Sequence, residues 1–415
     1  GELILFMDDT IGSAKKSIEE ESYNLIKDAL DWLKINYSKI LYKSDRLKIY
    51  YKYAEQLIKK NKAYVCHCLQ EELKNNREKG IECGCRQLPS NLQLKRWKEM
   101  FNLKEGKATL RIKTNMMHPN PAFRDRVLFK ISDRKHPRVG NKYRVWPTLE
   151  MSWAVDDHLL GITHIIRGND LTIESEMEKY IWDIFSWTSP VIIHTGLINI
   201  EGIEGAKVSK SKSQQEIKSG QFTGWDDPRT WSIQSLARRG IKPESIREFV
   251  KSIGLNKQDI TVPIETLYSI NRSIIDSKAD RYSFIEDPIK LNITKKPDWK
   301  TIEIPIHPDK KEKRTLELGD IFISKKDYDN FKGKEIRLLH LFNVELNKES
   351  KVTSIDNKNI RKINWISNFV KAKILLPNGQ WLEGIVDEGV KELKKNDVIQ
   401  FERFGFVKFD EFKKS

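Results

Sequence analysis

Three lysines and two serines lie within six residues, in the segment Lys-Val-Ser-Lys-Ser-Lys at 207–212. Polyphosphate chemistry needs such donors, because negative charge develops on the oxygens of the transferred phosphorus and lysines place positive potential there. A solvated loop would have the same composition, since loops rich in Lys, Ser and Gly are common. The context favours the phosphate-binding interpretation, because an apolar, strand-like run precedes the segment at 191–202 and a glycine-containing segment follows at 220–229.

All four cysteines lie within twenty residues, as the pairs Cys66-His67-Cys68 and Cys83-Gly84-Cys85. Two Cys-x-Cys pairs are the simplest way to bring four thiolates around one tetrahedral Zn²⁺. Disulfides are not expected in a cytosolic protein, and free thiols are the alternative. A zinc ion held by four cysteines would be structural, because no coordination position is left for catalysis.

Two adjacent carboxylates, Asp8 and Asp9, follow an apolar run at 3–7 that we expect to form a strand. Ligands of open α/β sheets bind beyond the carboxyl ends of the strands. The pair is therefore expected at the rim where a substrate would bind. Alternatively, the two carboxylates cap the end of the strand.

Helical periodicity follows this strand. Ile26, Leu30 and Leu33 have the i, i+4, i+7 spacing of a helix, and residues 46–60 place a wide apolar stripe on one helical face. Another helix is expected over 173–185. Helices that alternate with apolar strands indicate an α/β domain with a mostly parallel sheet.

An insertion interrupts this α/β pattern, and a β-rich region follows it toward the C-terminus. Strand-like alternation at 107–131 predicts an insertion that splits the nucleotide-binding fold. Two helices are expected at 232–239 and 243–253, since Pro243 suits a first helical position. From Arg281 onward, short β runs predict an all-β region of about 130 residues, with two small barrels as its natural arrangement.

Composition limits the class of protein and its partners. The 415 residues suffice for two or three domains with full cores. The net charge of +15 and the pI of about 9.3 predict a polyanionic partner, although a generally basic proteome would give the same balance. No apolar run approaches the ~20 residues of a membrane span and no signal-peptide pattern occurs, so we expect a cytoplasmic protein without a membrane partner. Because the chain begins at Gly1 in mid-strand without an initiator methionine, we expect a fragment.

Lys207 to Ser211 resembles the KMSKS signature of class I aminoacyl-tRNA synthetases, with Val208 at the methionine position. Nearly the whole chain is similar to glutamyl-tRNA synthetases of the archaeal type. The segments that carry this resemblance are 3–5, 8–10, 44–46, 63–66, 118–122, 124–125, 142–147, 156–158, 164–168, 224–229, 271–272 and 400–407.

The resemblance implies a Rossmann-like class I catalytic domain with an α/β insertion, a helical connector and all-β anticodon-binding barrels. The implied domains are the first part of the catalytic domain at 1–65, the insertion with the cysteine cluster at 66–145, the second part of the catalytic domain with the KMSKS-like loop at 146–225, the helical connector at 226–282, and the barrels at 283–415.

The implied reaction is activation of glutamate by ATP, with Mg²⁺, to an enzyme-bound adenylate, followed by transfer of the glutamyl group to tRNA(Glu). Lys210 would stabilise the pyrophosphate leaving group. Asp8 would face the α-amino group of glutamate, and Arg167 would pair with its side-chain carboxylate unless it forms a structural ion pair. The residues that would support Lys210 are Lys207, Ser209 and Ser211.

Three departures from the family pattern concern the substrate pocket. No His-x-Gly-His sequence, the family's HIGH motif, occurs. Phe6-Met7 stands where the family has Arg-Phe, and Leu149 stands where it has a tyrosine that helps bind the amino acid. One expectation is a truncated synthetase, with the HIGH motif carried by a separate chain or segment. The other is a degenerate relative that still binds tRNA. Glutaminyl-tRNA synthetase is the alternative enzyme, although Lys210-Ser211 favours the glutamyl type.

Overall fold

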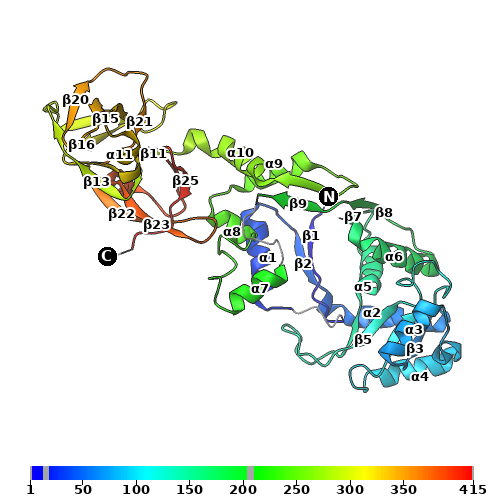
Figure 1. The fold of residues 1–415 in the computed structure, drawn as a ribbon. Coiled ribbons are helices and arrows are strands. Elements are labelled where there is room, and N and C mark those ends of the chain that lie inside the picture. The colour runs from blue at the N-terminus through cyan, green and yellow to red at the C-terminus, as the bar shows by residue number, and fades with distance from the viewer. Residues whose placement is uncertain (1, 13–17, 203–209, 414–415) are drawn as a thin grey trace. The chain divides into compact units, whose positions relative to one another are not determined.

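The structure, a computed structural model, describes residues 2–12, 18–202 and 210–413 (Figure 1). The chain divides into two compact units. The first contains residues 1–199 and 255–261, and the second contains residues 200–254 and 262–415. The short strands at the boundaries are β9 (Ile198–Glu201) and β10 (Ile260–Pro263).

A pair of parallel strands begins the first unit. β1 (Ile4–Met7) pairs with β2 (Lys39–Tyr42). A parallel pair needs a crossover connection, and α1 (Glu21–Trp32) supplies it. The strand predicted at 3–7 and the helix predicted from Ile26 and Leu30 are both confirmed.

A second parallel pair follows later in the same unit. β7 (His164–Gly168) pairs with β8 (Val191–Thr195), and α6 (Thr172–Phe185) connects the two strands. Helix α5 (Leu149–Leu159) packs against α6. The expected α/β pattern with parallel strands is confirmed, and the helix predicted over 173–185 begins one residue earlier.

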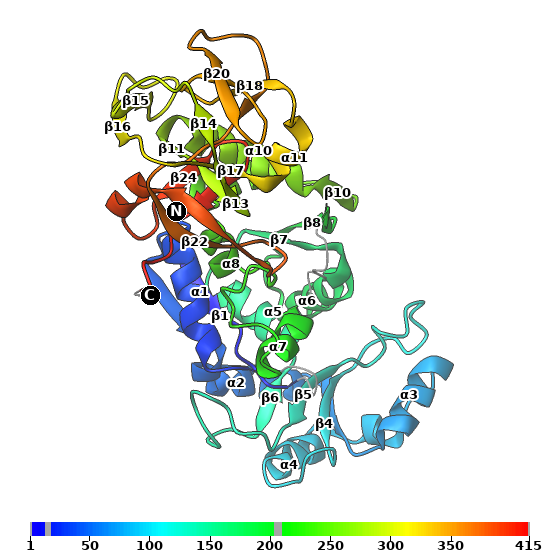
Figure 2. The same ribbon diagram turned by 60° about the vertical axis from the view of Figure 1, so that its left-hand side comes forward.

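An antiparallel sheet lies between the two parallel pairs in sequence, with the strand order β3-β4-β5-β6. Helix α4 packs against its first strand, and Figure 2 shows α4 close to β4 of the same sheet. The sequence predicted strands within 107–131, but not α4. The elements of this part are α2 (Leu47–Lys59), β3 (Ala63–Cys66), α3 (Gln70–Lys79), α4 (Ser90–Met100), β4 (Thr109–Ile112), β5 (Val127–Ile131) and β6 (Val145–Pro147).

One hydrophobic cluster joins these parts of the first unit. Helix α2 buries Tyr50, Ala54 and Leu57 in it, as the apolar stripe over 46–60 predicted. Three almost fully buried tryptophans belong to the same cluster: Trp97, Trp146 and Trp182. Each buried aromatic removes roughly 150–250 Å² from water, so this cluster fixes the insertion against the helices of the parallel strands.

Four helices open the second unit: α7 (Lys210–Lys218), α8 (Ile233–Arg238), α9 (Pro243–Ile253) and α10 (Ile264–Ile275). The Ser232 side chain caps α8 by accepting a hydrogen bond from the Ser235 amide. Pro243 occupies the first turn of α9, and Gly254 ends that helix with a φ of 67°. The two helices predicted after the lysine-rich segment are therefore confirmed.

The rest of the second unit is rich in β-strands, as expected, with one short helix among its described residues, α11 (Lys325–Phe331). The strands form sheets of two to five strands, and they bury three separate hydrophobic clusters. The strands are β11 (Arg281–Tyr282), β12 (Phe284–Glu286), β13 (Pro288–Leu291), β14 (Ile293–Thr294), β15 (Thr301–Pro305), β16 (Lys313–Glu317), β17 (Ile321–Ser324), β18 (Glu335–Leu338), β19 (Asn343–Glu345), β20 (Ser350–Ser354), β21 (Lys362–Ile363), β22 (Phe369–Leu375), β23 (Trp381–Asp387), β24 (Val398–Phe401) and β25 (Gly405–Lys408).

Within the described ranges, no helix combines the length and the apolar character that crossing a membrane requires.

Candidate active site

Asp9, at the end of β1, is buried and tied to the backbone of the neighbouring strand. Its Oδ1 accepts a hydrogen bond from the Ser44 amide at 2.9 Å, and its Oδ2 accepts one from the Ser44 hydroxyl at 2.7 Å. The ring of the buried His136 lies 2.7 Å, Nε2 to O, from the Asp9 carbonyl. These contacts fix the backbone from which the Asp8 side chain projects.

The Asp8 carboxylate is partly exposed and already has two donors on one oxygen. Its Oδ2 lies 3.4 Å from Nζ of Lys43 and accepts a hydrogen bond from Nε1 of Trp153 at 3.2 Å. The Lys43 side chain is only 3% exposed, and its ammonium also donates to the Ser152 hydroxyl at 2.9 Å. Asp8 therefore lies beside a buried positive charge.

Arg167, on β7, forms an ion pair inside the protein. Its Nη1 donates to Oε1 of Glu178 at 2.9 Å and to the Ser175 hydroxyl at 3.2 Å. Its guanidinium carbon lies 4.8 Å from the ring centroid of Trp153, and Nζ of Lys43 lies 5.3 Å from that ring. The structure thus places both Asp8 and Arg167 beside the indole of Trp153. It also contains an internal ion pair of Arg167, which was the alternative role expected from the sequence.

Sequence reasoning missed three residues of this site. Lys43 had a detectable signal, because it directly follows the β2 strand and so lies at the same kind of strand end as Asp8. Trp153 and Glu178 had none, because each lies within a helix whose spacing predicts only burial.

Two carboxyl groups near Arg167 have pKa values above their ordinary range. Burial raises the pKa of Asp157 to about 6 and that of Glu178 to about 7, although the positive charge of Arg167 opposes both shifts. Either group can therefore exchange a proton near neutral pH.

The lysine-rich segment is described only in part. Lys207 and Ser209 lie outside the described residues, and so do the side chains of Lys210 and Ser211. The backbone of Lys210 begins helix α7, which corrects the expectation that this part of the segment is a loop. An i, i+4 ion pair between Lys212 and Glu216, at 3.6 Å, stabilises the helix.

The four cysteines form one cluster. The Sγ atoms of Cys66, Cys68, Cys83 and Cys85 all lie within 4.8 Å of one another, and those of Cys66 and Cys83 are 3.7 Å apart. Four sulfurs at the usual Zn–S distance of about 2.3 Å are about 3.8 Å apart in a tetrahedron, so the donor set fits Zn²⁺.

The surroundings of the cysteine cluster favour a thiolate on Cys83. Nη1 of Arg111, a residue that is 2% exposed, lies 3.9 Å from Sγ of Cys66. The hydrogen bond between Cys66 and Cys83 lowers the pKa of the Cys83 thiol to about 5, whereas that bond and burial raise the pKa of the Cys66 thiol. A buried guanidinium beside a thiol favours its deprotonated form, which is the form that binds metal.

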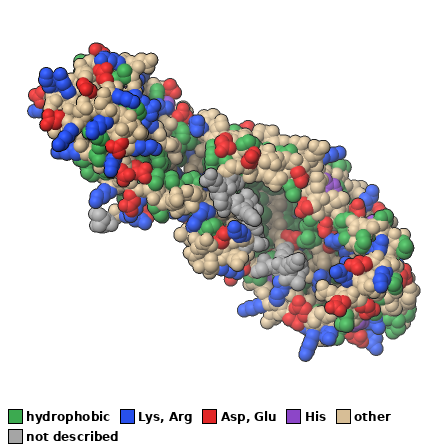
Figure 3. Space-filling model, viewed as in Figure 1, with side chains coloured by type: hydrophobic (Ala, Val, Ile, Leu, Met, Phe, Trp, Pro, Cys, Tyr) green, Lys and Arg blue, Asp and Glu red, His purple; other side chains and the backbone are tan. Residues whose placement is uncertain are grey.

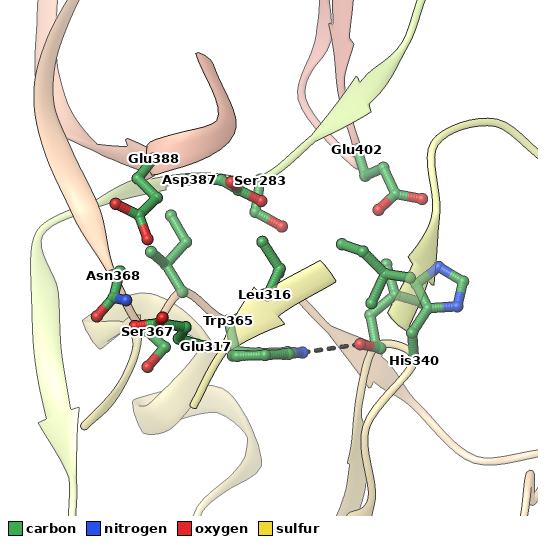
Figure 4. Close-up of a pocket in the computed structure, with 13 residues that line it drawn as sticks. Ser283, Leu316, Glu317, His340, Trp365, Ser367, Asn368, Asp387, Glu388 and Glu402 are labelled. Atoms are coloured by element: carbon green, nitrogen blue, oxygen red, sulfur yellow. Dashed lines mark hydrogen bonds between the residues drawn. The ribbon is translucent and has the colours of Figure 1, made fainter. Parts of the chain in front are cut away.

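A pocket with both apolar and polar lining residues lies among the strands of the second unit (Figure 4). It contains about 430 Å³ of empty space, part of which is open solvent. Glu402 and His340 lie at one end and Asn368 and Glu388 at the other, with the Trp365 indole between them. Burial raises the pKa of Glu402 and lowers that of His340, so both groups tend toward their neutral forms. Such a pocket offers hydrogen-bond donors and acceptors beside an aromatic ring.

Three family models match this chain. The model described as tRNA synthetases class I (E and Q), catalytic domain, matches residues 1–277. Two models described as the anti-codon binding domain of the same synthetases match residues 279–364 and 339–410. The expected order of a class I catalytic part followed by anticodon-binding parts is therefore confirmed.

Curated relatives agree with these matches. Glutamate–tRNA ligases from Pyrococcus abyssi and Pyrococcus horikoshii are each 43% identical to this chain, over 99% of the chain and 75% of the relative. The glutamate–tRNA ligase from Thermococcus kodakarensis is 41% identical with the same coverage. These matches confirm the resemblance inferred from the sequence motifs. The chain belongs to the glutamyl and glutaminyl family of class I aminoacyl-tRNA synthetases.

Proposed function

We propose that this protein is a glutamate–tRNA ligase, which activates glutamate with ATP to glutamyl-adenylate and transfers the glutamyl group to tRNA(Glu). The observation that carries the proposal is the 43% identity to glutamate–tRNA ligases over 99% of the chain. The reaction would take place in the cytoplasm. No comparison supports the expectation that a separate chain supplies the HIGH motif.

The site of the first unit suits an amino acid with an acidic side chain. Asp8 would bind the α-amino group, and Arg167 would bind the side-chain carboxylate. In support, Trp153 contacts both residues, and among the described residues the side-chain hydrogen bonds of Arg167, to Glu178 and Ser175, come from Nη1 alone. The other guanidinium nitrogens, Nε and Nη2, can meet a planar carboxylate.

The lysine-rich segment would act on ATP. Lys210 would stabilise the pyrophosphate as it leaves, with Lys207, Ser209 and Ser211 as supporting donors. Mg²⁺ would accompany the triphosphate, since it is usually held through substrate phosphates and few protein ligands.

Two further parts of the chain would serve the tRNA and the stability of the insertion. The residues that match the anticodon-binding models would bind the anticodon loop of the tRNA, by phosphate contacts and by stacking of its bases on aromatic side chains. Cys66, Cys68, Cys83 and Cys85 would hold a structural Zn²⁺.

The test is ATP–pyrophosphate exchange driven by glutamate or by glutamine, with and without tRNA. Exchange with glutamate but not with glutamine supports the proposal. Exchange with glutamine but not with glutamate would identify a glutaminyl enzyme. Absence of exchange, with tRNA binding retained, would mean a non-catalytic tRNA-binding relative.

We expect Lys210→Ala to reduce exchange by at least about a hundredfold, since one transition-state donor contributes roughly 10²–10³ in rate. The affinity for tRNA, measured by filter binding, should change less than about twofold. Lys218→Ala, at the other end of α7, is the matched control and should leave exchange unchanged. An equal loss of exchange and tRNA affinity in Lys210→Ala would contradict its assignment to the leaving group.

A further inference from the structure

The Glu178 carboxylate is fully buried, and only one of its oxygens is satisfied. Oε1 accepts the hydrogen bond from Arg167, but Oε2 has no hydrogen-bond partner among the described residues. The side chain is 0% exposed, so bulk solvent does not reach it. An ionised carboxylate with one bare oxygen is unfavourable in such a place.

The charges that face Glu178 come from three elements. Arg167 on β7 and Lys43 after β2 are positive, whereas Asp157 on α5 is a second acidic group. The hydroxyl of Ser175, on α6, accepts a hydrogen bond from Arg167. The same hydroxyl oxygen lies 3.0 Å from Nε2 of His194 on β8. Glu178 is therefore held between one bonded cation and one acidic neighbour.

We propose that Glu178 is a proton-linked positioning residue, which takes up one proton from solvent when the side-chain carboxylate of glutamate binds to Arg167. This inference rests on the proposed role of Arg167 in binding that carboxylate. No covalent bond changes, and the proton comes from water or buffer and lies on Oε2 of Glu178.

The physical reason is that two carboxylates cannot both stay ionised around one guanidinium in a buried site. A like charge within about 4–6 Å raises the pKa of one partner strongly. Burial has already raised the pKa of Glu178 to about 7, so Glu178 rather than the substrate would take the proton. Once neutral, Glu178 keeps its hydrogen bond to Arg167 while the full guanidinium charge faces the substrate.

The direction of the pH dependence follows. Below pH of about 7 Glu178 is already protonated, so glutamate binds without proton uptake. Above that pH each binding event takes up a proton, so affinity for glutamate falls by up to about tenfold per pH unit. A neutral side-chain amide requires no such proton, and the preference for glutamate over glutamine should shrink as the pH rises.

The experiment is titration calorimetry of the full chain with L-glutamate in two buffers of different ionisation enthalpy. The difference in heat gives the number of protons taken up. We expect nearly one proton per glutamate at about pH 8.5, and a value near zero at about pH 6. Glu178→Gln, which keeps the shape and a hydrogen-bonding oxygen, should remove the uptake at both pH values. Asp157→Asn is the matched control and should retain it.

The outcomes separate the inference from the function on which it rests. Binding of glutamate to the unaltered chain without proton uptake would overturn the role of Glu178 and leave the ligase proposal intact. The same conclusion would follow if Glu178→Gln kept the uptake or if Asp157→Asn abolished it. Absence of glutamate binding at every pH, with or without ATP, would instead overturn the proposed substrate site.

Discussion

Each side chain proposed to bind glutamate already has a counter-charge inside the protein. Asp8 lies 3.4 Å from the Lys43 ammonium, and Arg167 is bonded to the buried Glu178 at 2.9 Å. Binding of a zwitterionic amino acid would therefore exchange internal ion pairs for pairs with the substrate. The free energy of glutamate binding is then the difference between two sets of ion pairs. Substitutions of Lys43 or Glu178 should therefore alter the affinity for glutamate, although neither residue lies at the reacting atoms.

Asp9 should matter for stability rather than for substrate binding. Replacing it with alanine leaves the amide and the hydroxyl of Ser44 without their acceptor in a buried place. We expect Asp9→Ala to lower the free energy of unfolding by about 2–3 kcal/mol, measured by urea denaturation followed through tryptophan fluorescence.

The neighbouring Asp45 is the control for Asp9. Its side chain is 53% exposed and pairs with Arg138 at the surface, so Asp45→Ala should cost less than about 1 kcal/mol. Equal losses in the two variants would show that the buried hydrogen bonds of Asp9 do not hold β1 to the turn after β2.

At the scale of elements, local rules placed helix ends where the sequence provides the right residue. Ser232 caps α8 through its side chain, Pro243 lies in the first turn of α9, and Gly254 ends α9 with a positive φ. Each of these features depends on neighbours within four residues, so the sequence alone could predict it. Helix α7 was missed, because the lysines at its start favour a loop by composition.

Strand β23 depends on a glycine for its close approach to β12. A Cβ atom at Gly384 would lie 2.4 Å from the carbonyl oxygen of Ile285 and 2.6 Å from the ring of Phe284. We expect Gly384→Ala to destabilise this sheet by more than about 2 kcal/mol and to lower the melting temperature of the second unit in calorimetry.

Gly319 in the same β-rich part is the control for Gly384. A Cβ atom there meets only ordinary contacts, at 3.5 Å or more from Ser367. Gly319→Ala should therefore melt within a degree or two of the unaltered protein. A comparable melting temperature for the two variants would refute the steric role of Gly384.

At the scale of the whole molecule, the charge balance concerns the tRNA. The excess of 74 Lys and Arg over 59 Asp and Glu gives a net charge of +15. On the face in Figure 3, Lys and Arg side chains lie among Asp and Glu instead of filling one uninterrupted patch. Binding should therefore draw on many separate phosphate contacts.

We expect the affinity for tRNA to fall by at least about tenfold between roughly 50 and 200 mM salt, because each neutralised phosphate releases counterions. Glutamate affinity in the same solutions should change far less, since its partners Asp8 and Arg167 are partly or largely buried and buried charges are screened weakly. Filter binding and calorimetry over the salt series would measure both. A tRNA affinity independent of salt would contradict phosphate-dominated binding.

The sequence by itself determined the family, the alternation of helices and parallel strands, the clustering of the cysteines and the position of Asp8 at a strand end. All of these depend on motifs or on periodicity within a few residues. The meeting of the four thiols could be anticipated for the same reason, since each Cys-x-Cys pair is local and Cys83 lies only 17 positions after Cys66.

Only the tertiary structure decided which charged groups meet in the candidate active site of the first unit. Lys43, Trp153 and Glu178 come from a turn and two different helices, and the bond between Asp8 and Trp153 joins residues 145 positions apart. Helical spacing predicts that such positions are buried, but not which buried groups touch. The packing of β1, β2, α5, α6 and β7 determines which of these groups form ion pairs. The free-energy cost of burying an unpaired charge depends on its neighbours in space, and these are distant along the chain.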